Sequence, residues 1–422
     1  MMAYSTVIIG GGIAGLGAAS ISPNESIVLE KNNYLGGLCN SFSIDGFTFD
    51  RAIHLSFTNN EMARSVFNKT LVYEHFPESY NFYNNLWMKH PVQFNLKEMN
   101  LDFKVDALES YMRRDMTLEA LNYKEWLYSQ YGEVIADKFP CQYTKKYWRK
   151  DASELTLDWV SNRMSKISLK EIINGMLSED TGHNYYVNEM RYPREGGYFK
   201  FLSKMIENTN YKLESEVVGI DVVEKTVTLS SEETFGYESL ISTIPLNELV
   251  RRIKNVPLEV LTASNKLEYT SVYIVSVGFD QIEHINYPWY YVYDDDILAA
   301  RIHSPRWKSK NNVPRGKDSI QMEIHTLCNE NIAKEDLMEN INYSLTKLGY
   351  TIENIKFIDI KKEQYANVVF NFDTKEAKSI ILDYLDTVGI LTAGRFGEWD
   401  YFWSDQSLTS GMNKGKKILK KV

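Results

Sequence analysis

Three glycines near the start of the chain constrain its fold more than any other feature. Gly10, Gly12 and Gly15 form a G-x-G-x-x-G pattern directly after an apolar stretch and at the head of a helix of small residues. Glycines there permit a tight turn and close approach of the backbone to a pyrophosphate, which the free N–H groups of the helix start can bind. Glu30 follows 20 residues after Gly10, where a carboxylate can accept both hydroxyls of an adenosine ribose. The sequence therefore predicts an N-terminal dinucleotide-binding βαβ unit.

The composition restricts the partners of this unit. With 47 Lys and Arg residues against 56 Asp and Glu, the chain of 422 residues has a formal net charge of -9. Such a chain lacks the broad positive surface that nucleic acids need, so an anionic ligand has to be met by a few local arginines. Three scattered cysteines provide neither a disulfide framework nor a metal site, which favours a reducing cytoplasm. No stretch has the length of a membrane span, and neither a metal nor nucleic acid is expected as a partner.

Residue patterns divide the chain into different kinds of segment. An Asp-Gly pair at 45–46, between short alternating stretches, predicts a β-hairpin. Residues 97–190 have a helical texture, in which Asn122 and Glu125 are spaced as in a helix-capping box. Residues 269–323 are rich in β-branched and aromatic residues, which indicates a separate antiparallel sheet. The strands expected to return to the first unit are 216–229, 239–245 and 389–395.

These patterns predict an α/β protein in which a Rossmann-like domain is combined with a helical domain and an antiparallel β-sheet domain. The Rossmann-like domain is expected to be discontinuous, because its returning strands are far from the glycine motif in sequence. Its expected parts are residues 1–75, 193–250 and 385–422. The helical substrate domain is expected over 97–190, and the sheet domain over 76–96 and 255–384.

A second glycine pair indicates which dinucleotide is bound. Glu30 is followed by Lys31 and then by Leu35-Gly36-Gly37-Leu38, where the backbone can approach a cofactor again. Together these residues resemble the FAD-binding start that amine oxidases, protoporphyrinogen oxidases and UDP-galactopyranose mutases share. The resemblance implies FAD rather than NAD.

Further segments resemble the UDP-galactopyranose mutase family, especially its eukaryotic-type branch and related bacterial proteins. In chain order they are residues 49–54 (Phe-Asp-Arg-Ala-Ile-His), 90–95 (His-Pro-Val-Gln-Phe-Asn), 143–148, 158–163, 191–197 and 394–401 (Gly-Arg-Phe-Gly-Glu-Trp-Asp-Tyr). Arg301 follows Tyr291 at the spacing of a tyrosine and an arginine in the family's nucleotide-sugar site. The resemblance loosely covers nearly the whole chain.

This resemblance implies a set of site residues. The expected catalytic residues are His54 beside the flavin, and Arg163 and Arg301 on the diphosphate of a nucleotide sugar. Guanidinium groups suit a diphosphate because each can donate paired hydrogen bonds to its oxygens. Other substrate contacts are expected from Gln93, Asn95, Trp159, Tyr291 and Tyr401. The residues expected to bind the cofactor are Gly10, Gly12, Gly15, Glu30, Lys31, Gly36, Gly37, Leu38, Val217, Gly394, Arg395, Asp405 and Gln406.

The implied activity is the interconversion of the pyranose and furanose forms of a nucleotide sugar. In that family the N5 atom of reduced flavin attacks the anomeric carbon, with no net redox change. FAD must therefore be reduced first, and NAD(P)H is the expected reductant. The implied setting is polysaccharide biosynthesis in the cytoplasm. The protein could act as a monomer or as a homo-oligomer.

Two departures from the family pattern keep other functions open. Ala52 and Ile53 replace the flexible Gly-Gly before the histidine, and Phe370 stands where many relatives have a tyrosine. The FAD signature would equally suit an oxidoreductase like the amine oxidases or protoporphyrinogen oxidases. The altered Ala52-Ile53 pair would suit a binding protein without catalytic activity. Which nucleotide sugar is carried does not follow from these residues.

Overall fold

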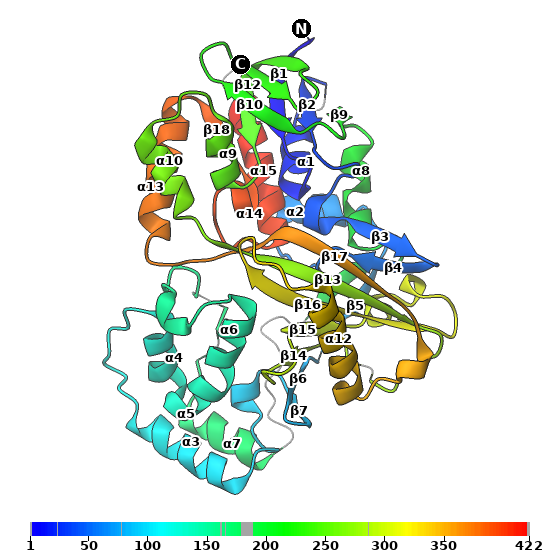
Figure 1. Cartoon of the computed structure of the whole chain (residues 1–422), viewed down its shortest axis with the longest axis vertical. Coiled ribbons are helices and arrows are strands. Elements are labelled where there is room, and N and C mark those ends of the chain that lie inside the picture. Colours follow the sequence, from blue (N-terminus) through cyan, green and yellow to red (C-terminus); the bar gives the residue numbers. More distant parts are fainter. Residues whose placement is uncertain are drawn as a thin grey trace.

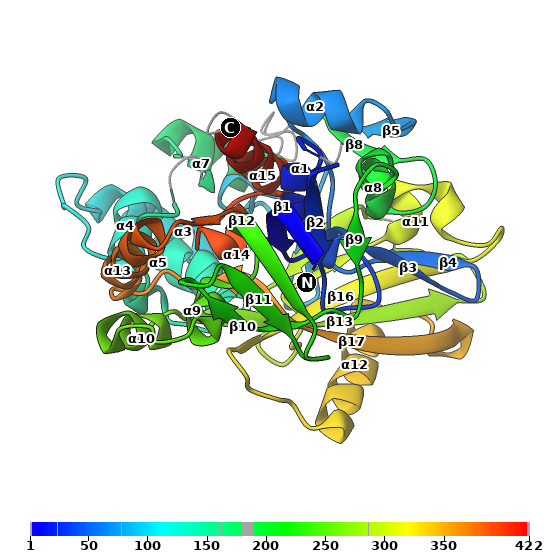
Figure 2. The ribbon, with the colours of Figure 1, turned by 90° about the horizontal axis from the view of Figure 1, so that it is seen from above.

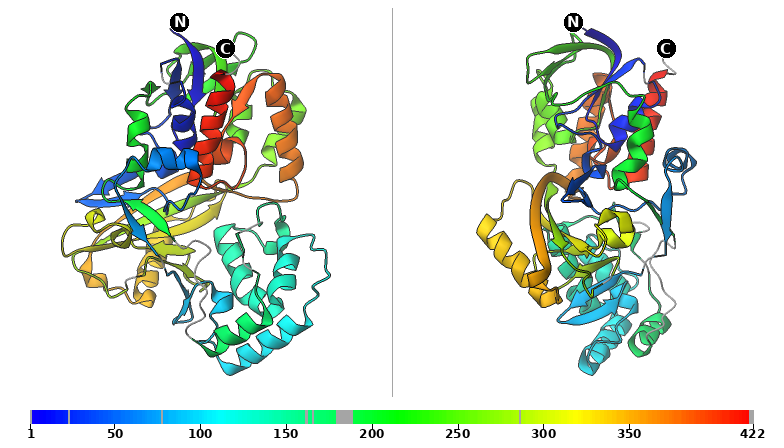
Figure 3. Two further views of the ribbon diagram at one scale, coloured as in Figure 1. Left: turned by 180° about the vertical axis from the view of Figure 1, so that it is seen from behind. Right: turned by 90° about the vertical axis from the view of Figure 1, so that its right-hand side faces the viewer.

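The computed structural model describes residues 2–22, 24–76, 78–160, 163–164, 166–178, 189–285 and 287–419. The chain is an α/β protein with two large sheets, as predicted (Figure 1). The first sheet and its helices form the upper body in that view, and the second sheet crosses the middle of the molecule. A lobe of helices lies beside the second sheet and forms a lower body with it. Views from the side and from behind show the same upper and lower bodies (Figure 3).

The first sheet contains the strand that precedes the glycine motif. Its strands are β1 (Met2–Ile9), β2 (Ser26–Leu29), β9 (Tyr211–Lys212), β10 (Val217–Asp221), β11 (Thr226–Leu229), β12 (Thr234–Ser242) and β18 (Ile390–Thr392). They have the order β10-β11-β12-β1-β2-β9, with β18 also paired to β12. Pairing is parallel from β18 through β12, β1 and β2 to β9, and antiparallel between β10, β11 and β12. The strands expected to return to the N-terminal unit are therefore part of its sheet.

Helix α1 (Ile13–Ala19) follows the glycine turn and packs closely against the last helix, α15 (Ser404–Leu419). The two helices lie side by side in Figures 1 and 2. A Cβ atom on Gly411 would lie 1.9 Å from the carbonyl oxygen of Ala14, so only glycine permits this approach. Close packing brings the start of α15 to the same end of the sheet as the glycine turn.

The second sheet has the order β17-β13-β16-β15-β14-β6-β7. Its strands are β6 (Tyr80–Tyr83), β7 (Leu86–Lys89), β13 (Tyr269–Phe279), β14 (Trp289–Val292), β15 (Arg301–His303), β16 (Asp318–Leu327) and β17 (Ile355–Val368). Neighbouring strands are antiparallel except β6 and β14, which pair in parallel because the helical lobe separates them in the chain. Helix α12 (Lys334–Leu348) covers one face, where its Leu337, Ile341 and Leu345 join an apolar cluster.

A tight hairpin leads into the loop that carries His54. Strands β3 (Ser41–Ile44) and β4 (Phe47–Asp50) pair across Asp45 and Gly46, both with positive φ, as predicted from the Asp-Gly pair. Strand β4 ends at Asp50, a fully buried carboxylate that accepts hydrogen bonds from Lys308 and from the Tyr192 hydroxyl. This buried ion pair anchors the start of the His54 loop to the body of the protein.

The helical lobe contains the expected cap. Its helices are α3 (Leu101–Arg113), α4 (Tyr123–Tyr131), α5 (Glu133–Ala136), α6 (Gln142–Tyr147) and α7 (Leu169–Leu177). At the start of α4 the Asn122 side chain accepts a hydrogen bond from the Glu125 backbone, at 3.0 Å. The Glu125 carboxylate in turn accepts from the backbone of Leu121 and the side chain of Asn122. The cap deduced from Asn122 and Glu125 is therefore confirmed.

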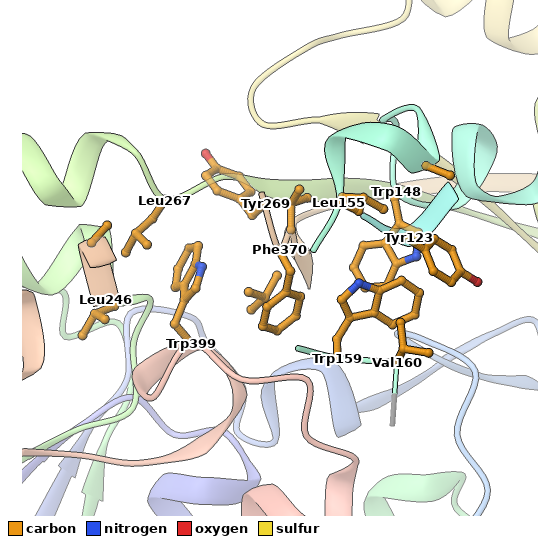
Figure 4. Close-up of a cluster of buried hydrophobic side chains, with 14 of the residues drawn as sticks. Tyr123, Trp148, Leu155, Trp159, Val160, Leu246, Leu267, Tyr269, Phe370 and Trp399 are labelled. Atoms are coloured by element: carbon orange, nitrogen blue, oxygen red, sulfur yellow. The ribbon is translucent and has the colours of Figure 1, made fainter. Parts of the chain in front are cut away.

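A continuous buried cluster joins the two bodies (Figure 4). Tyr123, Trp148 and Trp159 of the helical lobe pack beside Phe370, and Trp399 extends the cluster to the first sheet. Phe370 is buried in this cluster, with its ring centre 6.5 Å from that of Tyr401. The cluster holds the helical lobe at a defined position over the space between the sheets.

The remaining elements complete both bodies. They are α2 (Glu61–Phe67), β5 (Val72–His75), β8 (Met190–Pro193), α8 (Ser203–Ile206), α9 (Leu246–Arg252), α10 (Leu258–Asn265), α11 (Pro305–Lys308), α13 (Thr374–Thr387) and α14 (Gly394–Gly397). Helices α10 and α13 stand beside the first sheet in Figure 1, although α10 and most of α13 fall within 255–384. We therefore propose that α10 and α13 belong to the Rossmann-like domain, and keep the other expected boundaries as a proposal. Among the described helices, none is long and apolar enough to span a membrane.

Candidate active site

A cavity of about 800 Å³ lies where the two sheets and the helical lobe meet. Its lining draws on every part of the fold: Gly12 and Glu30 from the first sheet, Tyr147 from the helical lobe, Glu323 from the second sheet and Tyr401 from the C-terminal segment. Segments that are distant in sequence therefore line one cavity.

The glycine turn forms an open cradle at one end of this cavity. Gly10 has a φ of +100°, which favours glycine, and a Cβ atom on Gly12 would meet no other atom within 4 Å. Glu30 accepts a hydrogen bond at 2.7 Å from the backbone of Gly11 and another at 2.9 Å from that of Asn32. The carboxylate is thus held beside the open side of the backbone at Gly12, an arrangement that fits the ribose and pyrophosphate of a dinucleotide.

Most residues expected at the cofactor line the cavity. They are Gly10, Gly12, Glu30, Lys31, Gly36, Gly37, Leu38, Val217, Gly394, Arg395 and Asp405. Gly15 lies outside the lining, and a Cβ on it would be 1.9 Å from the Gly10 carbonyl oxygen, so it serves the packing of the turn. Gln406 also lies outside, is exposed, and accepts a hydrogen bond from the Trp403 backbone at the start of α15.

His54 lines the cavity with a defined tautomer. Its Nδ1 lies 3.0 Å from the carbonyl oxygen of Ala52, and since a carbonyl only accepts, Nδ1 carries the hydrogen. Nε2 therefore has the lone pair, and it faces the Cys39 sulfur at 3.9 Å. Burial lowers the pKa of His54 to about 4 and raises that of Cys39 to about 12, so both groups are neutral at pH 7.

The buried neutral state of His54 predicts acid sensitivity. Because its pKa is about 4 in the folded protein and 6.5 in the unfolded chain, the unfolded chain binds its proton first as the pH falls. Between about pH 6.5 and 4, we expect the free energy of unfolding to fall by roughly 3 kcal/mol through this residue. Urea unfolding of wild type and His54→Asn at several pH values tests this expectation. Identical pH profiles for the two proteins would contradict it.

Arg301 is held by a buried carboxylate. Its Nε and Nη2 donate to the same oxygen of Glu323 at 3.0 and 2.7 Å. The other oxygen of Glu323 accepts from the backbone N–H of Ile53 at 3.2 Å. Burial tends to raise the pKa of Glu323, but the charge of Arg301 outweighs burial and the pKa is lowered. Glu323 therefore fixes Arg301 and the His54 loop together, in ionised form.

Arg163 lies between two aromatic rings. Its guanidinium carbon is 4.1 Å from the ring centre of Tyr401 and 4.3 Å from that of Trp403, and Nη2 donates to the Tyr401 carbonyl. The Tyr401 hydroxyl is 3.2 Å from that of Tyr147, and the Tyr147 ring centre is 6.0 Å from the guanidinium carbon of Arg301. Two tyrosines thus connect the two arginines across the cavity.

Of the other residues expected to contact the substrate, three line the cavity and one lies outside its lining. Gln93, Trp159 and Tyr291 line the cavity, and the ring of Tyr291 lies 4.4 Å from that of His90. Asn95 is buried outside the lining, where its amide donates to the carbonyl of Pro91 at 2.9 Å. Residues 161 and 162, within the stretch 158–163, lie outside the described residues.

Comparison with known proteins identifies the fold. Residues 8–70 match a family model described as an NAD(P)-binding Rossmann-like domain. A solved structure of reduced UDP-galactopyranose mutase is 23% identical, covers 99% of this chain and 96% of its own, and has a TM-score of 0.92. The chain has the fold of UDP-galactopyranose mutase.

Two oxidoreductases share the UDP-galactopyranose mutase fold with lower scores. One, from Exiguobacterium sp. 255-15 and assigned as a protoporphyrinogen oxidase, is 16% identical over 100% of both chains, with a TM-score of 0.76. The other, a putrescine oxidase bound to putrescine, is 13% identical over 99% of each chain, with a TM-score of 0.62.

Several cavity residues were not predicted as site residues, among them Tyr147, Glu323 and His325. Tyr147 falls within the stretch 143–148 that carries the mutase resemblance, but its partners became visible only in the structure. Glu323 and His325 alternate with apolar residues along β16, from residue 321 to 325. Polar residues at every second position of a buried strand indicate a polar face, and this signal was available in the sequence.

Proposed function

We propose that the protein is an FAD-dependent nucleotide-sugar mutase that interconverts pyranose and furanose forms. The observation that carries the proposal is the shared cavity, which has a dinucleotide cradle at Gly12 and Glu30 and two arginines, Arg163 and Arg301, connected by tyrosines. A nucleotide sugar and a flavin dinucleotide both carry diphosphates, so one cavity needs both features.

The residues around the cradle fit FAD. The open side of Gly12 leaves room for the pyrophosphate, and Glu30 stands where the adenosine ribose would be bound. Arg395 donates to the carbonyls of Phe402 and Ala366, which hold its charge at the cavity wall near the start of α15. When bound and reduced, by NAD(P)H in this proposal, FAD supplies a nucleophilic N5 for the anomeric carbon of the sugar.

The arginines suit the departing diphosphate. Within the described part of the chain, Arg301 commits Nε and Nη2 to Glu323, so its Nη1 is available to a ligand. Because Glu323 and the aromatic rings orient both guanidinium groups beforehand, little reorganisation is needed when charge develops on the leaving group. We propose that Arg163 and Arg301 stabilise that charge, while the Tyr147 and Tyr401 hydroxyls bind further oxygens.

An amine oxidase-like or protoporphyrinogen oxidase-like activity is the second candidate. The fold shared with the Exiguobacterium protein and putrescine oxidase favours it. The cavity lining contains Arg163, Arg301 and Arg395 but also six carboxylates among the described residues, including the Glu323 that binds Arg301, so the charge of the lining does not exclude a cationic amine. We prefer the mutase, in a cytoplasmic polysaccharide pathway, because the guanidinium groups and tyrosine hydroxyls offer the hydrogen-bond donors that a diphosphate requires.

Reduction separates the two candidates. We expect the purified protein to contain FAD and, once reduced with dithionite, to convert one member of a panel of nucleotide pyranoses into a furanose, without reoxidation of the flavin. Chromatography of the nucleotide sugars and the visible spectrum provide the two measurements. Furanose formation only by the reduced form supports the mutase. Bleaching of the oxidised flavin by an amine or a porphyrinogen, with no furanose from any sugar, contradicts it.

A further inference from the structure

Strand β16 has a buried polar face, of which Glu323 and His325 line the cavity. Its Ile320, Met322 and Ile324 join the apolar cluster under α12, while Gln321, Glu323 and His325 point to the opposite face because side chains alternate along a strand. Gln321 donates to the carbonyl of Asp50, and Glu323 binds Arg301, so these two have structural partners. His325 differs from both.

His325 is a buried imidazole whose ring nitrogens form no hydrogen bond of normal geometry with the described residues, although the nearby Ser271 backbone acts against the lowering of its pKa by burial. Only 5% of the residue is exposed, and it lines the cavity. Its Nε2 lies 4.0 Å from Glu323, which is too long for a hydrogen bond. Leaving a buried polar group without a hydrogen bond is unfavourable, so a buried imidazole at a cavity wall indicates a place where a ligand binds.

His325 lies between the proposed diphosphate site at Arg301 and the proposed cofactor site near Arg395. Its ring packs against that of Tyr147, with 4.7 Å between the centres, next to Arg301. The Tyr147 hydroxyl is 3.3 Å from Asn367, which in turn is 3.4 Å from Nη1 of Arg395. A sugar that joins a diphosphate at Arg301 to a reactive cofactor must pass through this region.

The protonation state of His325 determines which kind of ligand group it can hydrogen-bond. Burial lowers its pKa to about 4, so the imidazole is neutral at pH 7 and has one donor and one acceptor. A phosphate oxygen needs only donors, which the neighbouring arginines already provide. A sugar hydroxyl both donates and accepts, and therefore matches a neutral imidazole.

We infer that His325 hydrogen-bonds a hydroxyl group of the substrate's sugar and selects a sugar that has this hydroxyl over the corresponding deoxy sugar. The inference rests on the proposed function and deepens it. It makes His325 a specificity-determining residue that contacts the substrate, and requires no proton transfer.

Binding to the reduced holoenzyme tests this role. The probes are UDP, UDP-galactopyranose and its monodeoxy analogues, and the proteins are wild type, His325→Phe and His325→Asn. In the wild type, we expect one deoxy analogue to bind about tenfold more weakly than UDP-galactopyranose, the size of one hydrogen bond. In His325→Phe this penalty, the difference in affinity between the deoxy analogue and UDP-galactopyranose, should disappear, while UDP binds within about twofold of wild type. In His325→Asn, which keeps a donor and an acceptor, part of the penalty should return.

His303 provides a matched control. It is 2% exposed, its ring nitrogens are also unpaired, and it lies on the adjacent strand β15 outside the cavity lining. His303→Asn should therefore keep the wild-type penalty. Thermal unfolding of all variants verifies that they are folded.

Three results would overturn the inference. If every deoxy penalty persists in both His325 variants, the imidazole does not contact a sugar hydroxyl. If the His325 variants bind UDP and UDP-galactopyranose more weakly by the same factor, His325 acts through Arg301. If the variants have a changed flavin spectrum, His325 contacts the cofactor. A wild type that binds neither UDP nor UDP-galactopyranose would instead contradict the proposed function itself.

Discussion

Replacement of Gly12 by valine is expected to yield a folded but colourless protein. A Cβ at this position meets no protein atom within 4 Å, so the fold tolerates it, but the added side chain occupies the cradle where the pyrophosphate would lie. Overpacking of this kind should weaken FAD binding by about a hundredfold or more, which is about 3 kcal/mol. The absorbance of the purified protein and reconstitution with FAD provide the measurement.

Two other glycines serve as comparisons for Gly12. Gly219→Val places a side chain on strand β10, where the nearest atom, in Thr228, is 3.7 Å away, and should retain both colour and stability. Gly15→Val should instead prevent folding, since even its Cβ would lie 1.9 Å from the Gly10 carbonyl. A Gly12→Val protein that is as yellow as wild type would show that the cofactor does not use this turn.

Substitution of Arg301 by alanine should reduce both stability and ligand binding. A nucleotide diphosphate should bind about 2 to 5 kcal/mol more weakly, because one charged partner is removed from a buried site. Since Glu323 is only 3% exposed and ionised, its carboxylate would lose its charged partner, and we expect a loss of about 3 to 5 kcal/mol in the free energy of unfolding.

A double variant separates the two effects of Arg301. Arg301→Ala with Glu323→Gln removes the unpaired charge, so it should recover much of the stability while UDP binding remains weak. Lys266→Ala, which breaks an exposed pair with Asp373, should change neither property. Urea unfolding and calorimetric titration with UDP are the measurements. If Arg301→Ala binds UDP as tightly as wild type, the assignment of this arginine to the diphosphate is wrong.

Local patterns were sufficient for much of the fold. The glycine turn, the Asp45-Gly46 hairpin and the Asn122 cap each depend on residues only a few positions apart, so their backbone preferences can be deduced from the sequence directly. The parallel pair of β6 and β14 could not be deduced this way, because these strands lie on opposite sides of the helical lobe in sequence.

The amide residues show the limit of motif comparison at the site. Asn95 falls in a stretch that resembles the mutase family, and the same resemblance assigned Gln406 to the cofactor, yet their side chains bind the Pro91 carbonyl and the Trp403 backbone. An amide forms equally good hydrogen bonds with its own backbone or with a ligand, and only the fold decides between them. Their expected contacts with substrate and cofactor remain predictions.

The sequence by itself determined the dinucleotide turn, the acid at Glu30, and the order of helical and β-rich segments, because glycine conformation and hydrophobic periodicity act locally. Only the tertiary structure decided which groups Arg163, Arg301 and His325 meet. The Ile53–Glu323 and Arg163–Tyr401 contacts span 270 and 238 residues, and pairing over such distances results from the packing of whole sheets and helices. Charges and polar groups buried by that packing require partners, and the shared cavity follows from where the fold provides them.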